Sequence, residues 1–361
     1  MNRLPFLDWT RGLAVLIMIQ CHAFNSFARL DTRQEGPYVL SQFVGGMAAV
    51  LFLFLAGVTF AFQMERLDRH GAPPLARLRS MLRRGGYILG IALLFRISNS
   101  IFTIPFPPFQ TLLKVDILNC MALAMLVFAL LALTPAGSRA RLSALLGLAV
   151  AVAAPLVSAA DSESIPWLVR EYLVPGRSRF AFFPWASYLA FGLAAGTTLR
   201  RLAPGRVETS LQWSLIAGFG LILVGQYFSN IPYSLYAKSQ FWLDSPSLII
   251  IRLGIILVIL AGAYLWTEYV AGTGWSFVQS LGKTSLLVYW VHVILVYGWL
   301  LRHWKKALTI PQTSAVTMGI VGLMVLLSVA WLRWKARRRP RKAVSAPEPV
   351  LAEVLAQRSG L

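Results

Sequence analysis

Three residues near the start of the chain, Asp8, Arg11 and His22, bring together side chains that can move a proton in a buried place. They lie in the stretch LDWTRGLAVLIMIQCHAFNSF, which is mostly apolar and long enough to cross a bilayer as a helix. An imidazole, with an ordinary pKa of about 6.5, can accept a proton from a hydroxyl or an amine near neutral pH. Ionisable groups at membrane depth are costly to insert, so their presence points to a functional site.

The spacing places two of these groups on one face of a helix. Arg11 and His22 are eleven positions apart, which corresponds to about three turns, about 16 Å of rise, and side chains pointing within about 20° of each other. Asp8 precedes Arg11 by three positions and can pair with it. The same residues also fit an interfacial ion pair and a histidine bonded to a backbone carbonyl, so this alternative stays open.

The composition indicates which elements hold these groups. The 361 residues are 57% hydrophobic and only 13% charged, where a soluble domain has about 25% charged residues. The net charge is +20, and the basic residues stand mainly between apolar blocks, which is typical of membrane topology and not of nucleic-acid binding. Both cysteines lie inside apolar blocks, so neither a disulfide framework nor a metal site is expected.

Ten apolar blocks predict an all-α, polytopic membrane helix bundle with about ten transmembrane helices. The bundle occupies residues 1–335, and residues 336–361 are expected to form a basic, disordered cytoplasmic tail. The expected spans are 9–28, 41–63, 85–102, 113–133, 142–160, 181–199, 211–229, 247–268, 283–301 and 313–332.

The loops alternate in charge along the chain. Arginines gather in the loops after the second, fourth and sixth spans and in the tail. The intervening loops are poorer in Lys and Arg, except for the stretch LRHWKK, which is basic on the expected outer side. Under the positive-inside rule both termini are cytoplasmic. Ten spans agree with this, because an even number of spans leaves both termini on the same side of the membrane. The expected location is the inner (plasma) membrane, crossed many times.

Several stretches, in order, resemble the integral-membrane acyltransferases, and within them the bacterial heparan-alpha-glucosaminide N-acetyltransferase-like branch. An Asp, an Arg-Gly pair and a downstream His open the domain in that superfamily. The resemblance covers roughly residues 5–300. Its stretches are LDWTRGLAVLIMIQCH, FLFLAGVTFAF, LRSMLRRGGYILG, KVDILNCMALAM, RFAFFPWASYLAFGLAAG, SPSLIIIRLG and LGKTSLLVYWVHVILVYG.

The resemblance implies transfer of an acyl group, most simply acetyl, from cytoplasmic acetyl-CoA to a saccharide hydroxyl or amine, free or lipid-linked. By position, Arg11 and His22 fall on the motif Arg and His. The further matches are the basic cluster Arg79, Arg83 and Arg84, the polar site Asp116 with Asn119, and the late Tyr289, Trp290 and His292.

Elementary chemistry gives these residues roles. His22 is the expected base or acylated group, assisted or oriented by Asp116 and His292. Guanidinium groups suit the CoA phosphates, and the residues expected to bind CoA are Arg79, Arg83, Arg84 and Arg11, the last of which either holds CoA or pairs with Asp8. Since the third span is expected to begin at residue 85, its N-terminus would add backbone donors beside Arg83 and Arg84. Plain topological charge is the alternative for these arginines. Candidates for contacting the acceptor are Asn119, Trp185, Tyr188 and Arg252, the last of which also fits snorkelling or an internal ion pair.

A second class of function uses the same buried polar groups. A secondary transporter or flippase for a lipid-linked or small anionic substrate would employ them as a relay, without CoA. The sequence leaves open the acceptor, O- versus N-acylation, acyl chain length, a direct versus an acyl-enzyme route, and monomeric versus oligomeric states.

Overall fold

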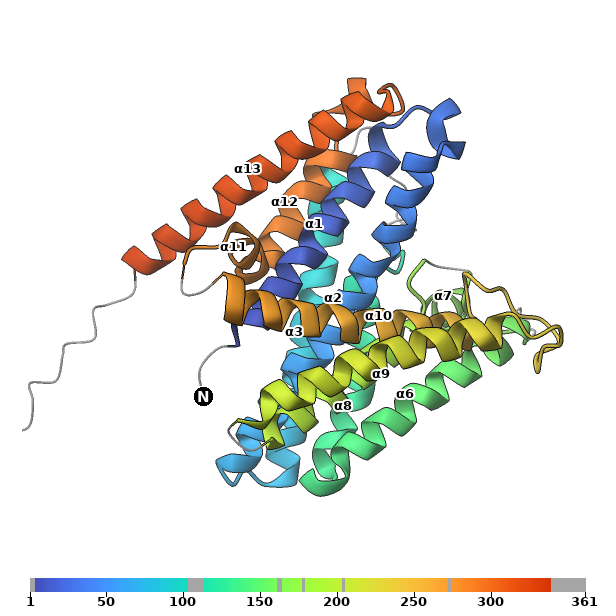
Figure 1. Ribbon diagram of the computed structural model, residues 1–361, viewed down its shortest axis with the longest axis vertical. Helices are drawn as coiled ribbons and strands as arrows, with labels where there is room; N and C mark the ends of the chain where they lie inside the picture. Colours follow the sequence, from blue (N-terminus) through green and yellow to red (C-terminus); the bar gives the residue numbers. More distant parts are fainter. Residues whose placement is uncertain are drawn as a thin grey trace, which may run out of the picture.

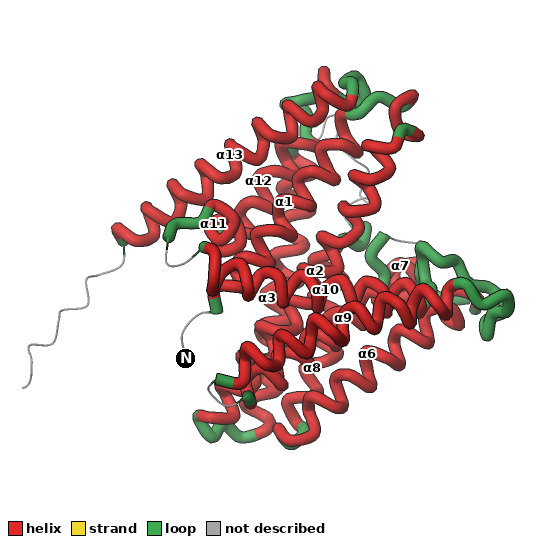
Figure 2. Tube along the Cα trace, in the orientation of Figure 1, coloured by secondary structure: helices red, strands yellow, loops and turns green. Residues whose placement is uncertain are grey.

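The computed structural model describes residues 4–102, 113–160, 164–176, 179–202, 205–271 and 274–338. Within these ranges the chain forms twelve α-helices joined by short loops and 3₁₀ turns, and the secondary-structure view is helical throughout (Figure 2). The all-α prediction is therefore confirmed. Most of the tail predicted to be disordered lies outside the described residues.

The helices fall where the apolar blocks lie, and each of the ten expected ranges contains one. Two additional short helices, α7 and α11, precede longer ones. The bounds are α1 (Pro5–Phe27), α2 (Gly36–Arg69), α3 (Pro74–Ile101), α5 (Ile117–Phe128), α6 (Ala136–Ala159), α7 (Trp167–Leu173), α8 (Phe182–Arg201), α9 (Arg206–Ser229), α10 (Pro246–Leu265), α11 (Phe277–Lys283), α12 (Ser285–Tyr297) and α13 (Ile310–Arg337).

In the part of the chain that the structure describes, fewer helices than the sequence predicts are both long enough and apolar enough to cross a membrane. Among the described residues, five helices are long and apolar enough to cross a membrane alone: α2, α6, α9, α10 with its π-helical extension to Val270, and α13. Helices α11 and α12 together make a sixth when counted as one bent span. The protein is thus a multi-pass membrane protein, and the expected count of ten is not confirmed.

Helix α1 lies at the centre of one half of the molecule. It packs against α2, α11, α12 and α13, which surround it in Figure 1. Helix α8 joins this half to the other, because it packs against both α2 and α6. Helices α9 and α10 lie side by side and cross α2 obliquely (Figure 1). Most of the apolar side chains of α9 are exposed.

Glycines allow backbones to touch where the helices that carry the polar residues meet. A Cβ at Gly12 would lie 1.9 Å from the carbonyl oxygen of Val278, and one at Gly282 would lie 1.9 Å from that of Asp8. The Arg-Gly pair therefore has a packing reason, since Gly12 lets α11 approach α1 directly. Small residues serve the same purpose at many membrane-helix contacts.

The chain bends sharply between α11 and α12. Their axes differ by 89° at Thr284, whose side chain bonds to Ser280 O and to Ser328 Oγ on α13. Within the span expected over 283–301, α12 covers Ser285–Tyr297, and the bend separates it from α11, which ends at Lys283. The bend turns α12 alongside α1, so that the second half of the chain contributes a side chain beside His22.

A buried ionic cluster ties α2 to α6 at the arginine-rich end of the bundle. Arg139 has no exposed surface, and its guanidinium lies 2.6 Å from Asp68 and 3.3 Å from Glu65. The same guanidinium donates to the carbonyls of Leu131 and Thr134. The cluster is extended by Arg77, which pairs with Asp68, and by Arg201, 3.6 Å from Glu65.

Candidate active site

Two histidines from opposite ends of the sequence meet inside the bundle. His22 on α1 places Nδ1 3.0 Å from Nε2 of His292 on α12, and the two rings are nearly parallel. His292 is fully buried, whereas His22 is half-buried and faces a cavity. Tyr297 stands edge-on to His22 and Tyr289 edge-on to His292, so aromatic rings enclose the pair.

The hydrogen bonds assign the proton of each ring when both are neutral. Nδ1 of His292 lies 2.7 Å from the carbonyl oxygen of Val288, which can only accept, so this nitrogen carries hydrogen. Nε2 of His292 then has a lone pair and accepts from Nδ1–H of His22. The remaining nitrogen, Nε2 of His22, keeps its lone pair and has no hydrogen-bond partner among the described residues. His292 thus fixes the tautomer that makes His22 a base.

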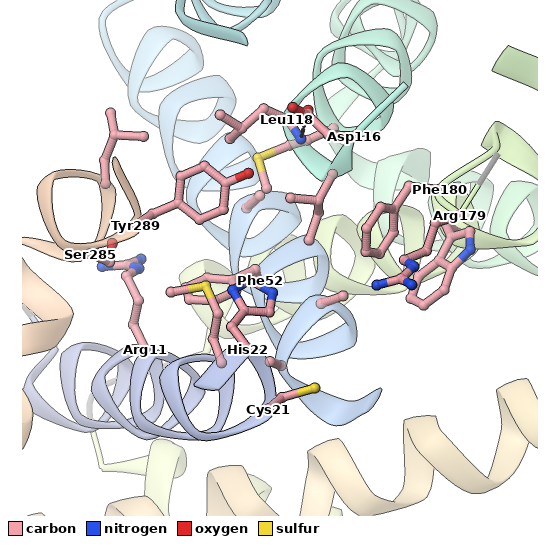
Figure 3. Close-up of a pocket in the computed structure, with 18 of the residues that line it drawn as sticks. Arg11, Cys21, His22, Phe52, Asp116, Leu118, Arg179, Phe180, Ser285 and Tyr289 are labelled. Carbon is pink, nitrogen blue, oxygen red and sulfur yellow. Dashed lines mark hydrogen bonds between the residues drawn. The ribbon is translucent and has the colours of Figure 1, made fainter. Parts of the chain in front are cut away.

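One cavity of about 630 Å³ connects this imidazole with arginines on either side. In Figure 3, His22 lies between Arg11 on one side and Arg179 on the other, with Asp116 and Tyr289 along a further wall. Side chains from α1, α2, α3, α5, α8 and α12 line the cavity. A substrate lying in it would therefore pass the lone pair of His22.

The end of the cavity nearer the start of α1 holds Arg11 and Arg84. Arg11 pairs with Asp8 at 3.2 Å, as the three-residue spacing suggested. Arg84 donates to Oε1 of Gln63 at 3.0 Å and lines the cavity. Arg79 and Arg83 are exposed and lie outside the lining, so direct contact between them and a ligand in the cavity stays a prediction.

The expectation that α3 begins at residue 85 is wrong. The helix begins at Pro74, and a hydrophobicity pattern could not show this because its first turns are basic and lie outside the apolar block. Arg83 and Arg84 therefore stand in the interior of the helix, where backbone N–H groups are engaged in the helical ladder. Any anion held there would rely on guanidinium groups alone.

Asp116 and Asn119 form the N-terminal cap of α5. The Asp116 carboxylate accepts from the backbone N–H groups of Leu118 and Asn119, and it lies 3.2 Å from Arg96. Asn119 is buried and donates to the hydroxyl of Tyr172. Asp116 lines the cavity, but its described hydrogen bonds reach neither imidazole. These contacts favour a structural role for both residues over the catalytic and substrate-binding roles predicted for them.

Substitutions at Asp116 separate these roles. Asparagine caps a helix about as well as aspartate, so we expect Asp116→Asn to keep transfer activity within about threefold. Asp116→Ala removes the cap and is expected to lower the free energy of unfolding by about 0.5–2 kcal/mol. Activity and thermal melting of the two purified variants check this. An Asn variant as inactive as a His22 variant would instead make Asp116 an acid or base.

The other end of the cavity is aromatic and cationic. Trp185 lines it, with the Arg252 guanidinium 5.8 Å from the Trp185 ring centroid. Tyr188 is buried behind Trp185 and, like Arg252, lies outside the lining. The structure adds Arg179, which opens the family-like stretch RFAFFPWASYLAFGLAAG but which the sequence analysis does not single out, because it stands in a loop ahead of the apolar span.

A multi-pass bundle of membrane helices, in which a buried histidine supports a second histidine that faces an interior cavity, defines a membrane protein with a site suited to proton or group transfer. The comparison with protein families narrows this class. The family model for the heparan-alpha-glucosaminide N-acetyltransferase catalytic domain matches residues 3–233, and the chain belongs to this family. No curated protein matches the chain.

Family membership confirms the suspected resemblance and places an acetyltransferase domain in the chain. Acetyl-CoA is the acyl donor of this family. The matched range contains His22, Asp116, Arg84 and Trp185, but it ends before α10 and α12. His292 and Arg252 lie beyond it, so the contact between His22 and His292 is a finding of the structure alone.

Proposed function

We propose that this protein transfers an acyl group, most simply acetyl, from cytoplasmic acyl-CoA to a hydroxyl or amine of a cell-envelope saccharide. The observation that carries the proposal is the single cavity lined by Arg84, Arg11 and His22. A donor held near the arginines and an acceptor at the other end would meet at the only ring nitrogen of the histidine pair that retains an unshared lone pair.

The arrangement of the loops supports an inner-membrane location with both termini cytoplasmic. The ends of α2 and α8 and the starts of α3, α6 and α9 carry clusters of arginine. These ends group together in the lower part of Figure 1. The basic residues near the opposite ends are fewer and more dispersed, with Arg29 and Arg33 after α1 and with Arg302, Lys305 and Lys306 after α12. By the positive-inside rule the arginine-rich ends face the cytoplasm, which places Arg84 on the side where acyl-CoA is present.

The cavity offers surfaces suited to the parts of acyl-CoA. Arg84 supplies a guanidinium for a phosphate, and Arg79 and Arg83 stand on the same helix nearer the cytoplasm. Between Arg84 and His22 the wall is largely apolar, with Ile88 and Met125 among its residues, which suits the acyl arm. The protein's contribution is thus to hold the thioester carbonyl beside Nε2 of His22.

The chemistry follows from the tautomer. In the direct route, Nε2 of His22 takes the proton of the acceptor as its oxygen or nitrogen attacks the thioester carbonyl, and that proton then passes to the departing CoA sulfur. In the acyl-enzyme route, the same lone pair attacks the thioester carbonyl and CoA leaves as thiolate. The acceptor oxygen or nitrogen then attacks the acetyl group, the bond from that group to Nε2 breaks, and the acceptor's proton passes to the CoA thiolate. Both routes need His292 to keep the hydrogen on Nδ1 of His22.

CoA binding tests the proposal at the donor end. We expect CoA to raise the melting temperature of the purified protein and Arg84→Gln to weaken CoA about tenfold or more, since a charge-assisted bond to phosphate is worth about 1.5–3 kcal/mol. Arg141→Gln, an exposed arginine of α6 outside the cavity, is the matched control. No effect of CoA at millimolar concentration would contradict the proposal and favour a transporter.

A further inference from the structure

Arg179 is a cation beside the cavity that has no hydrogen-bond or ion-pair partner within the described part of the chain. It precedes α8, lines the cavity and is exposed. No hydrogen bond or ion pair to another described residue engages its guanidinium. A guanidinium presents five donors in a planar fork that matches carboxylate and phosphate groups, so this side chain is equipped for an anion.

The other charges that line the cavity are already engaged. Arg11 pairs with Asp8, and Arg84 bonds to Gln63. Asp116 is the one acidic side chain among the described lining residues, and it pairs with Arg96 while capping α5. The positive charge of Arg179 is therefore not balanced within the cavity, and a concave site of low dielectric strengthens its attraction for an anion.

Aromatic and amide groups surround this cation. Phe180 and Trp185 stand edge to face with ring centroids 5.0 Å apart, and both line the cavity. Asn25 near the end of α1 and Gln42 near the start of α2 add amide groups to the same end. An aromatic surface beside amides suits a sugar, whose ring carries apolar C–H faces and hydrogen-bonding hydroxyls.

The position of Arg179 relative to His22 fits an acceptor and not the donor. In Figure 3 the guanidinium lies on the far side of His22 from Arg11, next to Phe180. Arg84, the lining arginine that suits a donor phosphate, stands on α3 toward the arginine-rich end of the bundle. Arg179 is also close enough to act electrostatically on Cys21 and His22.

We propose that the acceptor is an anionic saccharide, whose phosphate or carboxylate is bound by Arg179 while its sugar ring lies against Trp185 and Phe180. This inference rests on the proposed function, because it assigns the acceptor half of the same cavity. It goes further by fixing the charge class of the acceptor. A neutral sugar would gain no charge-assisted bond from the guanidinium, and an amino sugar lacking an anionic group would be repelled.

Binding to purified protein in nanodiscs tests the inference without requiring turnover. The probes are glucose 1-phosphate, its neutral counterpart methyl glucoside, and inorganic phosphate, each titrated while the melting temperature is followed. We expect glucose 1-phosphate to bind about tenfold or more tightly than either other probe. Arg179→Gln should abolish this preference, whereas Arg302→Gln, an exposed arginine outside the cavity, should retain it.

A lipid-bound pair of probes identifies the source of the anion. Nanodiscs containing undecaprenyl-phosphate-linked glucose are compared with nanodiscs containing a neutral glucosyl diacylglycerol. Arg179-dependent stabilisation by the anionic glycolipid, by glucose 1-phosphate, or by both supports the inference and names a lipid-linked, a free, or either form of acceptor. Equal stabilisation by anionic and neutral probes, no stabilisation by any probe, or a preference that survives Arg179→Gln overturns it.

Titration of CoA in the same samples separates the two proposals. CoA is expected to stabilise wild type and Arg179→Gln equally, because the donor end does not involve Arg179. If CoA binds but the anionic sugars show no preference, the inference fails and the proposed acyltransferase stands. If CoA does not bind, the proposed function fails, whatever the sugars do. If Arg179→Gln weakens CoA instead of the sugar phosphate, Arg179 belongs to the donor site and the inference is wrong.

Discussion

Replacing His22 by glutamine is expected to lower acetyl transfer by about 100- to 10,000-fold, the range that a positioned general base contributes. Glutamine keeps a polar side chain of moderate size beside His292 but has no basic nitrogen. The affinity for CoA, measured by the rise in melting temperature, should change little, because the phosphate-binding groups lie elsewhere in the cavity. The measurement is initial-rate transfer from radiolabelled acetyl-CoA to envelope glycans.

Two further variants make the His22 result specific. His303→Gln alters an exposed histidine outside the cavity and should leave the rate unchanged. His292→Ala removes the group that accepts the hydrogen bond from Nδ1–H of His22. It should lower the rate by a smaller factor than the change at His22, because the hydrogen of His22 is then no longer fixed on Nδ1 but the basic imidazole remains. Full activity of His22→Gln would remove the imidazole from the mechanism.

Replacing Arg139 by methionine is expected to produce the largest loss of stability, about 3 kcal/mol or more in the free energy of unfolding. The side chain is fully buried and is shared by Asp68 and Glu65. Methionine fills much of the space but leaves both carboxylates without their central cation. Thermal melting of the detergent-purified variant, followed by tryptophan fluorescence, measures the effect.

Variants of neighbouring residues control for the loss of a positive charge. Arg141→Met removes an exposed arginine of the same helix and should change melting little, because exposed charges contribute about 0–1 kcal/mol. Combining Arg139→Met with Asp68→Asn and Glu65→Gln should recover part of the lost stability, because the two carboxylates that lose Arg139 as a partner are then replaced by neutral amides. Equal destabilisation by Arg139→Met and Arg141→Met would show that the cluster is not a stabilising unit.

The sequence predicts the helices well because membrane helices correspond to uninterrupted apolar blocks in the sequence. Each of the ten expected ranges contains a helix, and Arg11 does pair with Asp8. The pattern fails where helices extend into polar sequence, as at Pro74, or where they bend. The bend at Thr284 depends on side-chain bonds to Ser280 and Ser328, the latter on another helix, and no local pattern specifies such contacts.

The candidate site could be predicted only in part, for the same reason. His22 and His292 were each identified as polar groups at membrane depth, but their contact across 270 positions depends on how α12 packs against α1. For Asp116 the family resemblance predicts an orienting role; its oxygens cap α5 and bind Arg96 in the structure, and the orienting role stays a prediction. Arg179 opens the family-like stretch RFAFFPWASYLAFGLAAG, but it lies in a loop ahead of the apolar span, and only the packing of the helices shows that it lines the cavity.

The central claim is that one cavity brings the thioester of acyl-CoA to His22. The most direct measurement is a cryo-electron microscopy structure of the protein in nanodiscs with a non-hydrolysable acetyl-CoA analogue. We expect the phosphates on the Arg84 side of the cavity and the acetyl carbonyl within contact distance of Nε2 of His22. An analogue bound outside this cavity, or with its acetyl group directed away from His22, would contradict it.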